Sequence, residues 1–407
     1  MSDSSTSLPE EKPVSRLASI DAYRGFVMFL MMAEILRLSK MAAAFAENHT
    51  FWGDFWRFLA FHQSHVAWVG CSLHDMIQPS FSFIVGVALP FSIASRLAKG
   101  HSKPRMAIHA FWRAAILILL GVFLRSMWGS QTNWTFEDTL TQIGLGYGFL
   151  FLLGLLSFRV QLGAILLILV GYWGAFAAYP LPDENFDWDK AGVTANWEHN
   201  AEGLAAHWNK NTNAAWAFDT WFMNLLPRKE AFTHNSGGYS TLSFIPTLAT
   251  MILGLFAGTI LRSERKWYTK FGSFLLLGAV CIGLGWTLGH FGICPIVKRI
   301  WTPSWVLFSG GICFLLLAAF YFFIDVCRLK VLVFPLIVIG ANSIVAYCIA
   351  DSGLNSFFTT NLKIHLGADF FQRFGDTYEL LFLGAVLLLI DWLILLWMYC
   401  KKVHVRI

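Results

Sequence analysis

The chain carries few charges for its length. Only 14% of its 407 residues are Asp, Glu, Lys or Arg, whereas 56% are hydrophobic, and the mean hydropathy is +0.56. Soluble domains usually carry about 25% charged residues, so this composition excludes a water-soluble globule of this length. The net charge of +5 is modest. Because the basic residues fall in short clusters between apolar segments, the charge does not predict nucleic-acid binding.

Common disulfide, metal and nucleotide motifs are absent as well. The seven cysteines are scattered, mostly within apolar segments, and none forms a CxxC pair, which predicts buried small hydrophobic residues. The chain has no HExxH pattern and no GxxxxGK[ST] phosphate loop, so we expect no metal site and no tightly bound cofactor. No cleavable signal peptide is evident. The polar residues 1–20 predict a disordered cytoplasmic tail.

What the chain does have is a series of hydrophobic segments of membrane-spanning length. A bilayer core of ~30 Å needs about 20 apolar residues per helix, and helices satisfy their own backbone hydrogen bonds there. We therefore expect an all-α, polytopic transmembrane helix bundle of about ten spans, forming a single domain over residues 21–407. The segments lie at about 23–44, 76–95, 107–127, 138–157, 161–179, 242–262, 271–290, 304–325, 331–350 and 377–399.

The distribution of Lys and Arg predicts the orientation. Short basic connections such as "RLAKGHSKPR" and "LRSERKWYTK" alternate with longer, less basic ones, which places both termini in the cytoplasm of a bacterial cell and the bundle in its inner membrane. Residues 45–75 and 180–241 then lie on the outer side of the membrane. The second segment is rich in Trp, Asn, Asp and His, which suits either sugar recognition or a cap at the membrane interface. Lys298 and Arg299 also lie on the outer side, although the positive-inside rule predicts few basic residues there. This exception favours a contact between these two cations and an anionic group.

The stretch "FHQSHVAWVGCSLHDMIQPSFSFIVG", residues 61–86, concentrates titratable groups at the mouth of an apolar segment. No ligand pattern supports a zinc site built from His62, His65 and His74. Asp75 precedes the segment, where free backbone N–H groups favour a carboxylate at a helix start. His65 has no such explanation, and a histidine can accept a proton near neutral pH.

Four further polar residues stand at or within the expected spans. Asp21 and Arg24 are three apart and share a helix face, where they can form an ion pair. Gln142 lies just inside a span, in the glycine-rich run "TQIGLGYGF", which suits close helix packing. Asn342 lies inside an apolar segment and needs a partner, for which a helix–helix hydrogen bond is the simple explanation.

Together these motifs resemble those of the heparan-α-glucosaminide N-acetyltransferase family and its bacterial relatives. The similarity covers nearly all of the chain from about residue 15. Its most specific part is the H-x-x-W-x-G run at His65, Trp68 and Gly70 with the D-x-x-x-P run that starts at Asp75 and reaches Pro79. The other matching runs are "SIDAYRG" at 19–25, "FWRA" at 111–114, "QIGLGY" at 142–147, "KRIWTPSW" at 298–305 and "NSIVAY" at 342–347.

The resemblance implies a membrane acyltransferase. Such an enzyme takes an acetyl group from the cosubstrate acetyl-CoA in the cytoplasm and delivers it to an amino sugar or glycan on the other side. His65 would be the active-site histidine, acting either as a general base or as the covalent carrier of the acetyl group, with Asp75 beside it. The residues expected to bind acetyl-CoA are Arg24, Lys103, Arg105, Arg113 and Gln142. Those expected to bind the acceptor are Asp21, Trp68, Lys298, Arg299 and Asn342.

The chain departs from the family pattern at the outer end of the first span. Glu34 stands where the family usually has an asparagine. An ionised glutamate cannot donate to a developing oxyanion, but it can act as a base or bind the sugar ammonium. Glu34 also supports a rival reading, a proton-coupled sugar or oligosaccharide transporter with this carboxylate as proton carrier. A relative that only binds glycan is a third reading. The sequence leaves open whether the chain forms a homodimer.

Overall fold

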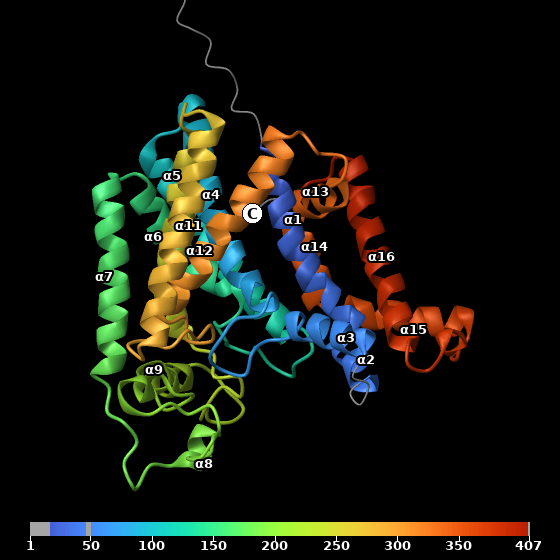
Figure 1. Ribbon diagram of the computed structural model, residues 1–407, viewed down its shortest axis with the longest axis horizontal. Helices are drawn as coiled ribbons and strands as arrows, with labels where there is room; N and C mark the ends of the chain where they lie inside the picture. Colours follow the sequence, from blue (N-terminus) through green and yellow to red (C-terminus); the bar gives the residue numbers. More distant parts are fainter. Residues whose placement is uncertain (1–16, 46–49, 406–407) are drawn as a thin grey trace, which may run out of the picture.

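The computed structural model describes residues 17–45 and 50–405, and its regular structure in these ranges is helical. Figure 1 shows long helices running side by side, with the short helices α2, α3, α8, α9 and α15 gathered at one end. We call this end the capped end. The helices are α1 (Ala18–Met32), α2 (Leu38–Ala44), α3 (Phe51–His62), α4 (Ile77–Ala98), α5 (Lys103–Ser126), α6 (Thr139–Gly154), α7 (Phe158–Ala177), α8 (Trp188–Ala191), α9 (Ala214–Phe222), α10 (Phe244–Arg262), α11 (Trp267–His290), α12 (Pro303–Phe320), α13 (Phe334–Ala341), α14 (Ser343–Asp351), α15 (Leu354–Leu366) and α16 (Glu379–Cys400).

The predicted all-α membrane class is confirmed. Within the described residues, seven helices are long and apolar enough to cross a membrane, namely α4, α5, α7, α10, α11, α12 and α16. The pair α13 and α14 is bent by 82° and makes an eighth span if it crosses as one unit. All ten predicted segments coincide with helices, but α1 and α6 have only 15 and 16 residues. The number of about ten membrane spans therefore stays a prediction.

The first predicted span, 23–44, has the wrong bounds. Helix α1 ends at Met32, a 3-10 turn follows, and Arg37 takes a left-handed conformation with φ of 48° before α2 begins. The apolar run continues through this turn, which is why hydropathy alone extends the span. Of the predicted tail 1–20, residues 1–16 lie outside the described residues, whereas 18–20 form the first turn of α1.

Glycines let the central helices touch backbone to backbone. A Cβ atom at Gly254 or Gly258 on α10 would overlap the carbonyl oxygen of Phe83 or Val87 on α4. A Cβ atom at Gly86 would overlap a carbonyl oxygen of α10 in the same way. Small residues permit this close approach of membrane helices. The start of α4, which leads in from residues 61–76, is thereby fixed against the centre of the bundle.

Residues 180–241 form a packed cap. Trp208 and Trp68 are fully buried in an apolar cluster with Tyr172 and Phe176 of α7. The indole N–H of Trp68 donates to the carbonyl oxygen of Trp208 at 3.1 Å. These two tryptophans therefore serve as the core of the cap, and their rings are covered by protein.

We expect Gly254→Ala to destabilise the protein by about 1–3 kcal/mol, because α4 and α10 must move apart to admit the methyl group. The matched control is Gly171→Ala on α7, where a Cβ atom would have nothing within 4 Å. It should be neutral or stabilising by up to about 1 kcal/mol through helix propensity. Thermal unfolding in detergent measures both changes, and equal unfolding temperatures for the two variants would contradict the packing described.

Candidate functional site

Two loops that are distant in the sequence meet at the capped end. The loop after α3 pairs with the loop between α11 and α12 through an antiparallel bridge of Val69 with Val297. Next to it, the backbone N–H of Gly70 donates to the carbonyl oxygen of Ile296 at 3.0 Å. Gly70 has a φ of 123°, a conformation that side chains disfavour. This glycine therefore allows the crossing that brings the two loops together.

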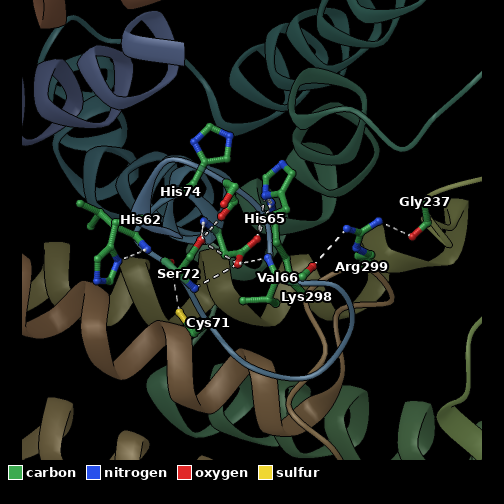
Figure 2. Close-up of polar contacts among 12 residues, drawn as sticks. His62, His65, Val66, Cys71, Ser72, His74, Gly237, Lys298 and Arg299 are labelled. Carbon is green, nitrogen blue, oxygen red and sulfur yellow. Dashed lines mark hydrogen bonds and ion pairs between the residues drawn. The ribbon is translucent and has the colours of Figure 1, made fainter. Parts of the chain in front are cut away.

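Arg299 ties a third loop to the same place. Its guanidinium donates to the carbonyl oxygens of Val66 at 3.1 Å and of Gly237 at 2.6 Å (Figure 2). It also lies over the ring of Tyr239, 5.2 Å from the ring centroid. Arg299 was expected to bind substrate, but its hydrogen bonds go to the backbone of two loops, which it positions.

The carboxylate of Asp75 is the centre of the cluster. Its side chain is 1% exposed. It lies 2.8 Å from Nδ1 of His65 and 3.4 Å from Nζ of Lys298. It also accepts from the backbone N–H groups of Val66 at 3.2 Å and Ser72 at 3.0 Å. No side chain caps the start of α4, so the backbone N–H groups of that helix start do not donate to Asp75 as expected.

Two groups face Nδ1 of His65. The carboxylate of Asp75, at 2.8 Å, only accepts, whereas the ammonium of Lys298, with its Nζ at 3.1 Å, only donates. The shorter contact, to the charged carboxylate, favours the tautomer in which Nδ1 carries the proton and Nε2 keeps its lone pair. Burial lowers the pKa of His65, and the charge of Lys298 lowers it further, although the hydrogen bond to Asp75 opposes both. Burial also lowers the pKa of Lys298, to about 8, against the attraction of Asp75. Near pH 7 the cluster therefore holds a neutral imidazole and a charged ammonium.

The three histidines of this region have three different partners. The ring centroid of His74 lies 4.5 Å from that of His65, and its Nε2 lies 2.8 Å from a carboxylate oxygen of Glu34. His62 instead accepts the backbone N–H of Leu73 at 3.1 Å through Nδ1. His62 thus orders the loop, whereas His74 connects Glu34 to the cluster. Within residues 17–45 and 50–405, no group of three or more His, Cys, Asp or Glu side chains is arranged to hold a metal ion.

A cavity of about 620 Å³ opens onto the cluster and is lined by His65, His74, Lys298 and Glu34. A second one of about 300 Å³ shares His65, His74 and Glu34 and continues toward α3. The larger cavity also has charged residues that the sequence did not single out as site residues, among them Arg125, Glu137 and Asp351. Each stands at the end of an apolar segment, where charged residues are common, so the sequence carried no distinguishing signal.

The residues expected to bind acetyl-CoA do not line either cavity. Asp21 and Arg24 form the predicted ion pair, 3.6 Å long, on α1. Lys103 and Arg105 begin α5 at the end opposite the cap. In the middle of α5, the guanidinium of Arg113 bonds the hydroxyl of a neighbouring tyrosine at 3.1 Å.

Gln142 and Asn342, both expected to meet a substrate, make structural hydrogen bonds. The side-chain N–H₂ of Gln142 donates to the carbonyl oxygen of Phe136 at 2.6 Å. The amide of Asn342 donates to the carbonyl oxygen of Val403 at 3.0 Å and accepts the N–H of Val405 at 3.1 Å. Asn342 therefore fastens the C-terminal segment to the bend between α13 and α14. Of the residues assigned to the acceptor, Lys298 is the one that the structure brings to His65.

Comparison with known proteins supports the resemblance seen in the motifs. No protein-family model matches the chain. Heparan-α-glucosaminide N-acetyltransferase from Homo sapiens is 24% identical over 376 residues, which cover 82% of this chain. The protein of the same name from Mus musculus is 23% identical over 403 residues, which cover 86% of it. The chain spans about half the length of these relatives, 52% and 55%. It is a distant relative of these proteins.

We expect Asp75→Asn to destabilise the protein by roughly 3–5 kcal/mol, because it leaves the buried ammonium of Lys298 without its carboxylate. The double variant Asp75→Asn/Lys298→Met removes both charges and should recover part of the loss. Thermal unfolding in detergent compares the two. A double variant less stable than Asp75→Asn alone would contradict this electrostatic pairing.

Proposed function

We propose that the protein is an integral membrane acetyltransferase that moves an acetyl group from acetyl-CoA to the amine of an amino sugar or glycan. One observation carries the proposal. A neutral histidine, held by the buried carboxylate of Asp75, lines a cavity large enough for a small molecule, with its Nε2 available. The name of the distant relatives supplies the type of group transferred and the class of acceptor.

The chemistry follows from the protonation of His65. The acceptor amine attacks the thioester carbonyl carbon, so a C–N bond forms and the C–S bond breaks. Nε2 of His65 takes the proton that the amine loses, and the departing CoA thiolate then takes it from the imidazolium. The carboxylate of Asp75 holds the ring and stabilises its charged form, as in other His–Asp pairs. A covalent route, with Nε2 attacking the thioester first, needs the same tautomer.

The two substrates approach from opposite ends in this proposal. By the positive-inside pattern, the capped end faces outward and the ends of α4 and α10 face the cytoplasm of a bacterial cell. Arg24, Lys103 and Arg105 would then meet the CoA phosphates, since guanidinium and ammonium groups bind phosphate well. The acceptor would enter the cavity at the capped end, where Glu34 can bind its ammonium group.

A second candidate function is a proton-coupled sugar transporter. The observation that favours it is the carboxylate of Glu34, which is 57% exposed within the cavity and paired with His74. A carboxylate–histidine pair can exchange protons as a substrate binds. In that case the sugar would cross unmodified, and His65 would not be needed for chemistry.

We expect His65→Ala to lower acetyl transfer by roughly 10²–10⁴-fold, the range associated with loss of a general base. The assay incubates purified protein with labelled acetyl-CoA and glucosamine and measures labelled N-acetylglucosamine. His365→Ala is the matched control, because this exposed histidine of α15 lines neither cavity, and it should keep wild-type activity. The proposal fails for this acceptor if wild type and His65→Ala transfer label equally or not at all.

The pH dependence of kcat/KM for acetyl transfer gives a further test, because it reports the groups of the free protein. The rate should rise as His65 loses its proton, with a midpoint below the ordinary histidine value, because burial lowers its pKa. It should fall again as the pH passes about 8, because Lys298 then loses the charge that is paired with Asp75. Lys298→Arg keeps a charge at that pH, so its falling limb should move to higher pH. An identical falling limb in both proteins would contradict this role of Lys298.

A further inference from the structure

A second group of charged residues lines the large cavity that contains His65. Arg125 stands at the end of α5, Glu137 precedes α6, and Asp351 ends α14. The charges of these two acids and of Asp138, which lines the same cavity, act on the guanidinium of Arg125. Among the residues that the structure describes, however, no ion pair joins any two of the three, and none donates to or accepts from another side chain. The cation and the two acids share one cavity without neutralising each other by direct contact.

Hydrogen bonds of neighbouring residues hold these groups in place. The indole N–H of Trp128, shortly after α5, donates to the carbonyl oxygen of Ser352 at 3.0 Å and so ties the end of α14 to the end of α5. The turn that follows requires Gly353, whose φ is 74°. The carboxylate of Asp138 accepts two backbone N–H groups of the first turn of α6 at 2.9 and 3.1 Å, which fixes Glu137 next to it. The group is therefore positioned by a scaffold.

The three charged groups differ in exposure: Arg125 is exposed, whereas Glu137 and Asp351 are half-buried. Burial raises the pKa of Glu137, with the charge of Arg125 opposing. The side-chain oxygen of Asn355, which lines the same cavity, is buried and has no hydrogen-bond partner. The groups that the cavity presents to a ligand are therefore the exposed guanidinium of Arg125 and the half-buried carboxyls of Glu137 and Asp351.

The chemistry of the group selects the ligand class. The guanidinium of Arg125 only donates, whereas the carboxyl oxygens of Glu137 and Asp351 can accept. A simple cation would satisfy the acids alone, and a simple anion would satisfy the arginine alone. A hydroxyl both donates and accepts, so a polyhydroxylated ring can satisfy both signs at once. A volume of about 620 Å³ also lies within the range of pockets that enclose small molecules.

We propose that Arg125, Glu137 and Asp351 form a ring-binding subsite that hydrogen-bonds the hydroxyls of a sugar acceptor whose amine faces His65. This inference rests on the proposed acetyl transfer, whose site it extends. It makes the three residues determinants of acceptor specificity, and it separates recognition of the ring from proton removal at the amine.

The test compares two ring amines in the same acetyl-transfer assay: glucosamine, which carries hydroxyls, and cyclohexylamine, which does not. In Asp351→Asn and Arg125→Gln, the KM for glucosamine should rise about 10–100-fold, as expected for one lost hydrogen bond to a charged group. The kcat for glucosamine should change much less, and the kcat/KM for cyclohexylamine should change less than threefold. Asp376→Asn, at an exposed acid that does not line the cavity, is the control and should behave as wild type.

If a variant loses kcat/KM equally with glucosamine and with cyclohexylamine, the residue has a structural role and the subsite is wrong. An unchanged KM for glucosamine would also contradict the subsite. A binding measurement separates this inference from the proposed function. Titration calorimetry should show glucosamine binding to wild type and at least tenfold weaker binding to Asp351→Asn. If wild type transfers no acetyl group but binds glucosamine more tightly than Asp351→Asn does, the proposed acetyltransferase function is wrong and the sugar subsite is supported. If both proteins bind glucosamine equally, the subsite is wrong.

Discussion

The site is organised by a single buried carboxylate. Asp75 is almost fully covered, and a charge in that position is tolerated only when it is paired and hydrogen-bonded. It meets this requirement with the imidazole of His65, the ammonium of Lys298 and backbone N–H groups of the loop after α3. Satisfying one charge therefore orients the imidazole of His65, orders that loop and brings the loop before α12 close to it.

The helices supply the rigidity on which this arrangement relies. Asp75 leads directly into α4, whose backbone lies against α10 at Gly86 and Gly254, so the carboxylate stands on a firmly packed helix. Arg299 joins the surrounding loops from the other side, through the carbonyl oxygens of Val66 and Gly237. Sites built on rigid elements hold their reacting groups more accurately than sites on free loops. The capped end thus combines a fixed histidine with a cavity that leaves space for substrate.

The sequence predicted the parts of this structure that depend on local pattern. Hydropathy located the helices of the bundle, and the spacing of His65, Trp68 and Asp75 identified the segment that forms the cluster. The predicted bounds of the first span were wrong, because the turn at Arg37, which separates α1 from α2, lies inside one apolar run. Lys298 was noticed for its charge, but its contact with a residue 233 positions away depends on the tertiary fold.

The contacts of several polar residues could not be predicted from the sequence for the same reason. Trp68 was expected at the acceptor and lies buried beneath the cap, and Asn342 was expected there and fastens the C-terminal segment. Arg125 and Glu137 had no sequence signal, because a charge at the end of a span commonly marks the membrane interface. They acquire a role only when distant helices place them in the cavity of His65.

In the proposed reaction, a thioester from one side of the membrane meets an amine from the other side at His65. Proteoliposomes of defined orientation test it, with labelled acetyl-CoA supplied only on the side of the basic connections and glucosamine only on the capped side. The account predicts labelled N-acetylglucosamine on the capped side with wild type and none with His65→Ala. Unmodified glucosamine crossing the membrane without any labelled product would contradict it.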